Sequence, residues 1–192
     1  MNVKNSIKKS DLTKQEIAKT FLLLINIHPL NEITIGDLTK TCGVNRNTFY
    51  YHFNNIADLI EYVVKNIVDE LLTKYPPKID SLESCFIAGI NFARNNKTAI
   101  NNIYHSTSRA IFERHLWHVC SYSVNAYLKS IPEELLPVKS PEEIDILRDF
   151  LKYSIFGFVI DWINRDMPED INEKIRTLVN LQIFRQLSKN VY

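Results

Sequence analysis

A run of polar, hydrogen-bonding side chains follows Gly43, with one apolar residue, Phe49, inside it. The run consists of Asn45, Arg46, Asn47, Thr48, Tyr50, Tyr51 and His52. Asn and Arg side chains can pair with the adenine and guanine edges in the major groove of DNA. Thr, Tyr and His side chains suit phosphate oxygens, which fix position more than sequence. The run therefore predicts a surface that contacts double-stranded DNA.

Two short helices joined at Gly43 are expected to position this run. Thr34 precedes Ile35, so its hydroxyl can cap the first helix, and that helix start can also receive a DNA phosphate. Gly43 suits the left-handed residue that ends the first helix. Four apolar residues have a spacing that lets the two helices share one small core: Leu38, Val44, Phe49 and Phe53. Together these signals predict a helix-turn-helix, whose second helix enters the major groove.

The segment from Thr34 to Leu59 resembles the DNA-binding domain of the TetR family of bacterial transcription regulators. The likeness is most specific in Thr48-Phe49-Tyr50-Tyr51-His52-Phe53, followed by a short turn and Asp58-Leu59. The resemblance implies an all-α protein in which an N-terminal three-helix DNA-binding domain precedes a helical ligand-binding and dimerisation domain. It also implies an inverted-repeat DNA operator as the partner.

By the same resemblance, the predicted contacts divide into two kinds. Arg46 and Asn47 correspond to residues that contact bases, and Thr34 to a phosphate contact at the helix start. The backbone contacts are Thr48, Tyr50 and His52. The complete predicted DNA-binding set is Thr34, Asn45, Arg46, Asn47, Thr48, Tyr50, Tyr51 and His52. Where the family usually has a phosphate-binding Lys, at the start of the fourth helix, this chain has Ile56, which predicts a smaller electrostatic share of the affinity.

Composition and charge fit this interpretation. The chain has 192 residues, of which 45% are hydrophobic and 23% charged, with only 4 Gly, as in a helical globular protein. Residues 1–55 carry seven basic and four acidic side chains, whereas the remaining residues carry 16 basic and 18 acidic ones. A basic N-terminal portion, including an arm with Lys4, Lys8 and Lys9, is typical of a DNA-binding head. On charge alone, the arm fits a solvated tail equally well.

Several other classes are disfavoured by the sequence. The start of the chain lacks the apolar core of a secretion signal, and the apolar segment 150–163 is too short and too often interrupted to span a bilayer. Three widely spaced Cys predict neither a disulfide framework nor a zinc site. We expect a cytoplasmic protein without a cofactor or metal. No glycine-rich phosphate loop, Gly-x-Ser-x-Gly motif or convincing carboxylate pair is present, so an enzyme is not expected.

Apolar spacing predicts helices along the rest of the chain, about nine in all. Helices are expected over 12–27, with Asp11 or Thr13 as cap, and over 56–74. Pro141-Glu142-Glu143 predicts a helix start, because Pro and acidic residues favour the first turn. Met167-Pro168-Glu169-Asp170 repeats that signal before a last helix that carries Ile171, Ile175, Leu178 and Leu187. The predicted domains are 1–55, which binds DNA, and 56–192, which regulates and dimerises.

The last two helices are predicted to form a homodimer. The segment 150–163 is apolar on nearly every side, so it must be buried on every side, and a second copy is the economical cover. Burial within one chain is the alternative. In the resembled family, the last two helices form a four-helix bundle between two copies. The segment also resembles the C-terminal domain of the subgroup that contains dihydroxyacetone-kinase operon activators.

Aromatic residues in the second domain are candidates for lining a ligand cavity. The predicted ligand-binding set is Phe86, Tyr104, Phe112, Trp117 and Phe156. Ordinary core packing is the alternative for each of them. A small-molecule effector is implied by the resemblance alone. The leading hypothesis is a dimeric, effector-controlled repressor. The alternative is an activator or co-regulator that is controlled by a protein partner.

Overall fold

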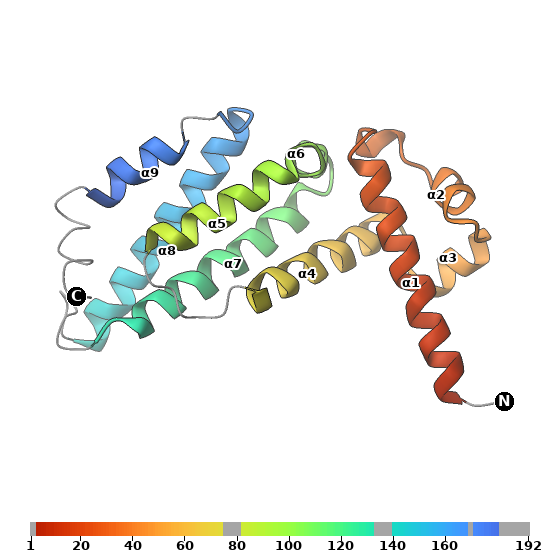
Figure 1. The fold of residues 1–192 in the computed structure, drawn as a ribbon, viewed down its shortest axis with the longest axis horizontal. Helices are drawn as coiled ribbons and strands as arrows, with labels where there is room; N and C mark the ends of the chain where they lie inside the picture. The colour runs from red at the N-terminus through yellow and green to blue at the C-terminus, as the bar shows by residue number, and fades with distance from the viewer. Residues whose placement is uncertain (1–2, 75–81, 133–139, 169–170, 181–192) are drawn as a thin grey trace. The chain divides into compact units, whose positions relative to one another are not determined.

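The computed structural model describes residues 3–74, 82–132, 140–168 and 171–180. Within these ranges the regular secondary structure is entirely helical (Figure 1). The helices are α1 (Val3–Ile25), the 3-10 turn η1 (Leu30–Glu32), α2 (Ile35–Cys42), α3 (Arg46–His52), α4 (Ile56–Lys74), α5 (Leu82–Asn95), α6 (Lys97–Tyr104), α7 (Arg109–Ser130), α8 (Pro141–Asn164) and α9 (Ile171–Asn180). The all-α prediction, with about nine helices, is confirmed.

The chain divides into two compact units. Unit 1 comprises Met1–Asp69 and Thr98–Glu113, and unit 2 comprises Glu70–Lys97 and Arg114–Tyr192. The division falls inside α4 and α7, so neither helix belongs to one unit alone. The predicted domain boundary after residue 55 stays a prediction. The compact units add the first part of α4 to the N-terminal helices, because Leu59 and Ile60 are fully buried there.

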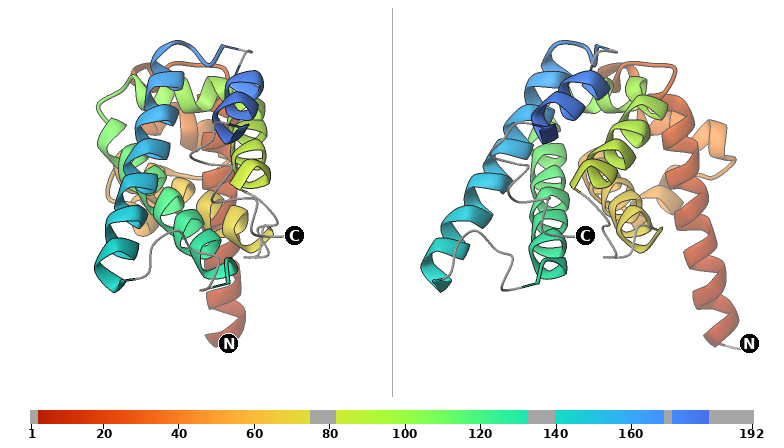
Figure 2. Two further views of the ribbon diagram at one scale, coloured as in Figure 1. Left: turned by 90° about the vertical axis from the view of Figure 1, so that its left-hand side faces the viewer. Right: turned by 60° about the vertical axis from the view of Figure 1, so that its left-hand side comes forward.

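The core of unit 1 holds the helix-turn-helix in place. Ile17, Phe21 and Ile25 of α1 are fully buried, as are Leu38 of α2 and Phe49 of α3. Burying an apolar side chain of this size stabilises the fold by roughly 1.5–3 kcal/mol. Helix α2 packs against both α1 and α3, and the further views in Figure 2 show the same neighbours. The predicted apolar face of the first helix therefore packs in the same core as the apolar residues of α2 and α3.

Helix α1 begins earlier than predicted. It starts at Val3 rather than near Leu12, so a cap at Asp11 or Thr13 is wrong. The physical reason is that no Pro or Gly lies between residues 3 and 11 to stop the helix from extending. The basic residues of the predicted arm are thus part of a helix, although their side chains lie outside the described ones. At the other end, Asn102 of α6 donates to the carbonyl of Ile25 at 2.7 Å and satisfies a carbonyl of the last turn.

Unit 2 is built from helices α5, α7, α8 and α9. Helix α5 lies along α9, and α7 and α8 share a cluster of buried side chains: Val124, Tyr127, Leu128, Ile131 and Leu151. Helix α8 begins at Pro141, as predicted, and Ser140 caps it in a capping box with Glu143.

One face of α8 is not covered within the described chain. Leu151, Trp162 and Ile163 are buried, whereas Phe150 is 56% exposed and Tyr153 is 61% exposed. Burial of segment 150–163 on every side within one chain, the alternative in the sequence analysis, is therefore wrong, and cover by a second copy stays a prediction. The reason is that Phe150 and Tyr153 are not part of the cluster that Leu151 shares with α7, although the ring centroid of Tyr153 lies 5.1 Å from that of Trp117.

Candidate nucleic-acid interface

The first turn of α2 is closed by Thr34. Thr34 has extended backbone angles (φ −98°, ψ 157°), and its hydroxyl oxygen accepts from the Asp37 N–H at 3.1 Å. The same hydroxyl donates to the Asp37 carboxylate at 2.5 Å. This bond is the main reason why the pKa of Asp37 lies below its ordinary value. Thr34 is the predicted cap, but its one proton points to Asp37. A phosphate oxygen needs a donor, so in this conformation the hydroxyl is not available to it.

Gly43 makes the turn between the two helices. Its φ of +72° lies in the left-handed region, as predicted. Its N–H donates to the Lys40 carbonyl at 3.3 Å, while the Val44 N–H donates to the Thr39 carbonyl at 3.0 Å. These two bonds form a Schellman motif, which satisfies carbonyls at the end of α2. The turn therefore fixes where α3 starts.

Asn45 is the N-cap of α3. Its Oδ1 accepts from the Thr48 N–H at 2.8 Å and from the Thr48 hydroxyl at 3.1 Å. Pairing with adenine needs both the oxygen and the nitrogen of an Asn amide. With the cap in place, Asn45 cannot form that pair, and Thr48 has already used its hydroxyl proton. Sequence reasoning placed both residues on the outward surface and missed the bond between them.

The exposed side of α3 is polar and aromatic. Phe49 is fully buried and forms the anchor of this seven-residue helix. Tyr51 is 77% exposed and Asn47 is exposed as well, whereas Tyr50 is 54% exposed and its ring centroid lies 5.6 Å from that of Phe49. Amide and phenol groups carry the donors that bases and phosphates can accept. The predicted outward orientation of these three residues agrees with their exposure.

Arg46 is exposed, but its guanidinium folds back onto α2. A Cβ atom built on Gly36 would lie 2.9 Å from Arg46 Nη2 and 3.5 Å from Thr34 Oγ1. The guanidinium thus lies against the first turn of α2, where Gly36 has no side chain. Proximity to Gly36 could not be predicted from the spacing of residues, because the two positions lie on different helices.

His52 and Lys14 lie together at the end of α3. Burial, and then the nearby charge of Lys14, lower the pKa of His52, whereas Asp11 opposes them. The Lys14 ammonium lies 4.4 Å from the ring centroid of Tyr62 and 5.3 Å from that of Phe53, which are cation–π distances. Lys14 was included in the charge of residues 1–55 in the sequence analysis but was not predicted to bind DNA. Lys14 places a positive charge near α3, whereas Ile56, which stands where the family usually has a Lys, does not.

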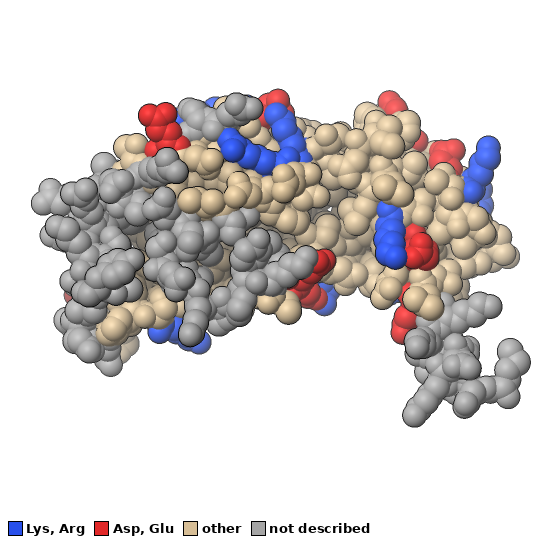
Figure 3. All heavy atoms as spheres, viewed as in Figure 1, with Lys and Arg blue, Asp and Glu red and all other residues tan. Residues whose placement is uncertain are grey.

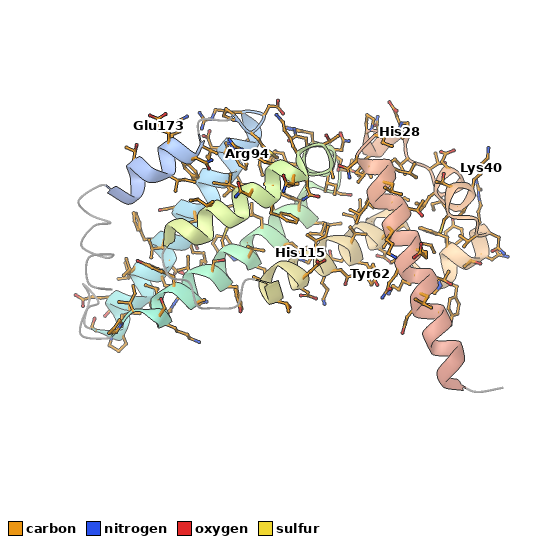
Figure 4. All side chains as sticks on the ribbon, viewed as in Figure 1. His28, Lys40, Tyr62, Arg94, His115 and Glu173 are labelled. Atoms are coloured by element: carbon orange, nitrogen blue, oxygen red, sulfur yellow. The ribbon has the colours of Figure 1, made fainter. Side chains whose placement is uncertain are left out.

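A second lysine, Lys40, is exposed on the helix before the turn. Lys40 is exposed on α2 and projects outward from that helix in Figure 4, whereas the labelled Tyr62 lies on α4. Its position in the first helix of a helix-turn-helix was the signal that sequence reasoning passed over. On the face shown in Figure 3, the coloured basic and acidic side chains are dispersed rather than gathered into one patch.

Two models of known protein families match this chain. Residues 24–63 match the family model described as bacterial regulatory proteins, tetR family. Residues 80–183, more than half of the chain, match the model described as transcriptional regulator C-terminal region. The chain belongs to the TetR family. It is therefore a transcriptional regulator with a helix-turn-helix, and not an enzyme.

A curated relative and a solved structure that resemble this TetR-family chain carry one name. The HTH-type dhaKLM operon transcriptional activator DhaS of Lactococcus lactis subsp. lactis is 33% identical over 67 residues, which span 35% of this chain and 36% of that protein. The match thus covers about a third of the relative's length. A solved structure of a dihydroxyacetone kinase operon activator DhaS aligns with a TM-score of 0.67 and 18% identity, covering 93% of this chain and 96% of that one. That likeness shows a shared fold.

The aromatic residues predicted to bind a ligand form two pairs. In unit 1, Tyr104 is fully buried, and its ring centroid lies 5.8 Å from that of Phe112. In unit 2, the ring centroids of Trp117 and Phe156 are 5.4 Å apart. The side chain of Phe86 lies outside the described ones. None of the described helices combines the length and apolar character needed to cross a bilayer.

Proposed function

We propose that this TetR-family regulator binds an operator by inserting the exposed side of α3 into the major groove. The observation that carries the proposal is the two-sided character of α3, in which Phe49 is fully buried while Asn47, Tyr50 and Tyr51 are exposed. Exposed donors on a helix held at both ends match the edges and phosphates of DNA.

Within this interface, the roles differ from residue to residue. Asn47 contacts a base edge, while Tyr50, Tyr51 and His52 contact the backbone. Asn45, Thr34 and Thr48 hold the two helix starts in shape, and contact DNA only where their internal bonds exchange for bonds to phosphate. Because an operator is part of the bacterial chromosome, the protein acts in the cytoplasm.

The regulator acts as a dimer through α8 and α9. The support is the exposed apolar face of α8, formed by Ile146, Phe150 and Tyr153, which are 64%, 56% and 61% exposed. A second copy covers this face and places two α3 helices at two half-sites of an inverted repeat. A Phe150→Glu variant should sediment as a monomer at concentrations where the wild type is a dimer. Leu23→Glu, at a residue of α1 that is 65% exposed, is the matched control and should leave the dimer intact.

For the sign of regulation we keep two candidates. The first is repression that a small molecule relieves, and by linkage such an effector and the operator weaken each other's binding equally. The second is activation, controlled by a protein partner. The name DhaS describes an activator in both matches, and the packing of Tyr104 on Phe112 fits a core rather than a cavity. Transcription in vitro from a promoter carrying the bound operator distinguishes the two, because occupancy lowers the transcript in one case and raises it in the other.

DNA binding itself is tested by fluorescence anisotropy with a labelled duplex. Tyr51→Ala removes an exposed aromatic residue from α3 and should weaken binding severalfold. Leu23→Ala removes an exposed apolar side chain from α1, outside both α3 and the dimer face, and serves as the control. Equal affinities for the wild type and Tyr51→Ala would contradict the proposed role of α3.

A further inference from the structure

The most informative contact outside the assigned interface joins the two helices of the helix-turn-helix. Gly36 lies in the first turn of α2, and Arg46 is the first residue of α3. The space that a side chain at residue 36 would fill is occupied by Arg46, since Nη2 lies 2.9 Å and Cζ 3.8 Å from the position that a Cβ atom would take. A separation under 3.0 Å is shorter than van der Waals contact allows, so a side chain at residue 36 must shift the guanidinium, which lies at the end of a flexible side chain.

The donors at this place come from Arg46. The Thr34 hydroxyl lies beside the same position, 3.5 Å away, but gives its proton to the Asp37 carboxylate. By contrast, the Arg46 guanidinium forms no hydrogen bond or ion pair with any other residue that the structure describes. It has five N–H donors and a permanent positive charge. Arg46 therefore has the chemistry to hold a phosphate, and its side chain is turned toward Thr34, the predicted phosphate contact.

We propose that Gly36 is a positioning residue, which by lacking a side chain turns Arg46 into a contact of the DNA backbone rather than of a base. This inference rests on the proposed function, because it assigns a role within the same interface. It replaces the base contact that the family resemblance implies for Arg46. Arg46 binds a phosphate diester from the side of α2, and base selection falls to the exposed residues further along α3.

The test is a double-mutant cycle on binding to two duplexes of equal length. One duplex is selected by the wild-type protein from random sequence, and the other has random sequence. Gly36→Ala should weaken both to the same degree and lower the slope of log affinity against log salt by up to about 0.9, the value of one phosphate contact. Arg46→Ala should do the same. In the Arg46→Ala background, Gly36→Ala should have no further effect.

Folding does not obscure this test. Gly36→Ala introduces a better helix former, so its melting temperature should not fall. Gly89→Ala is the matched control, because Gly89 is a helical glycine with open space around it, and DNA binding should be unchanged. Gly36→Leu introduces a larger side chain that displaces the guanidinium further. It tests the inference if Arg46 keeps its DNA contact beside the methyl group of Gly36→Ala.

Three outcomes would overturn the inference. The effect of Gly36→Ala could be the same in both backgrounds, or the losses could be confined to the selected duplex, which would make Arg46 a base contact. Alternatively, Gly36→Leu could leave binding unchanged while Arg46→Ala weakens it. If the wild type instead bound neither duplex, the proposed function itself would fail. The two failures are thus distinguishable.

Discussion

Asn45 and Asn47 lie two residues apart at the start of α3, and the structure predicts opposite consequences for their replacement by Ala. Asn45 accepts the Thr48 N–H at 2.8 Å, whereas Asn47 is exposed and caps nothing. Losing an N-cap of this kind costs about 1 kcal/mol of stability, with a range of roughly 0.5–2. The second bond, from the exposed Thr48 hydroxyl, adds little, because water replaces it. If the chain of 192 residues unfolds as one unit, 1 kcal/mol corresponds to a melting temperature lower by about 2–4 °C.

Asn45→Ala should therefore lower the melting temperature, and Asn47→Ala should not. Conversely, Asn47→Ala should weaken DNA binding on a selected duplex, because it removes a donor and an acceptor from the exposed side of α3. Asn45→Asp separates the two roles of residue 45. A carboxylate retains the cap and suits the helix start, so stability is kept, but it repels phosphate, so binding falls.

Thermal unfolding followed by circular dichroism and anisotropy titrations measure the two effects on the same samples. The reasoning is refuted if Asn45→Ala melts like the wild type, or if Asn47→Ala loses as much stability as Asn45→Ala. Either result would mean that the capping geometry does not describe the protein in solution.

Three further substitutions probe the same unit. Phe49→Ala should lower the free energy of unfolding by about 3–5 kcal/mol in urea titrations, because Phe49 is fully buried; a loss under about 1 kcal/mol would contradict its anchoring role. In the unbound protein, burial and Lys14 lower the pKa of His52. The negative charge of a bound phosphate should raise this pKa, so the wild type takes up a proton on binding DNA. Affinity at constant salt should then rise from pH 7 to pH 6, and a His52→Gln variant that kept this rise would rule the residue out. Thr34→Val should return the Asp37 pKa toward its ordinary value in carboxylate NMR titrations. In the wild type this lowered pKa stabilises the folded protein at pH values above the Asp37 pKa of the unfolded chain. That stabilisation is lost as the pH falls through the Asp37 pKa of the folded protein. An unchanged pKa in the variant would assign the shift to another group.

Local signals made much of the fold predictable. Gly43, Thr34 and Pro141 each mark a helix end through backbone chemistry that needs no distant partner, and the structure places all three at the expected ends. The start of α1 was missed because no local signal opposes helix between residues 3 and 11. Asp166 and Met167 have φ of 60° and 52°, although neither is Gly, so their turn before α9 could not be predicted from residue type.

The candidate site was predictable in its location and less so in its detail. Exposure of Tyr50 and Tyr51 follows from helical spacing around Phe49. The contact of Arg46 with Gly36 and the stacking of Lys14 on Tyr62 depend on how separate helices pack, which spacing along one helix does not contain. The bond between Asn45 and Thr48 shows the same limit, because both side chains suit DNA and suit each other.

Selection of bound duplexes from random sequence tests the central claim most directly. If the exposed side of α3 enters the major groove in a dimer, the selected sequences should converge on an inverted repeat with half-sites about one helical turn, or a multiple of it, apart. The same selection with Asn47→Ala should relax the preference within each half-site. Sequences that do not converge, or a repeat that survives unchanged in Asn47→Ala and Tyr51→Ala, would contradict the account.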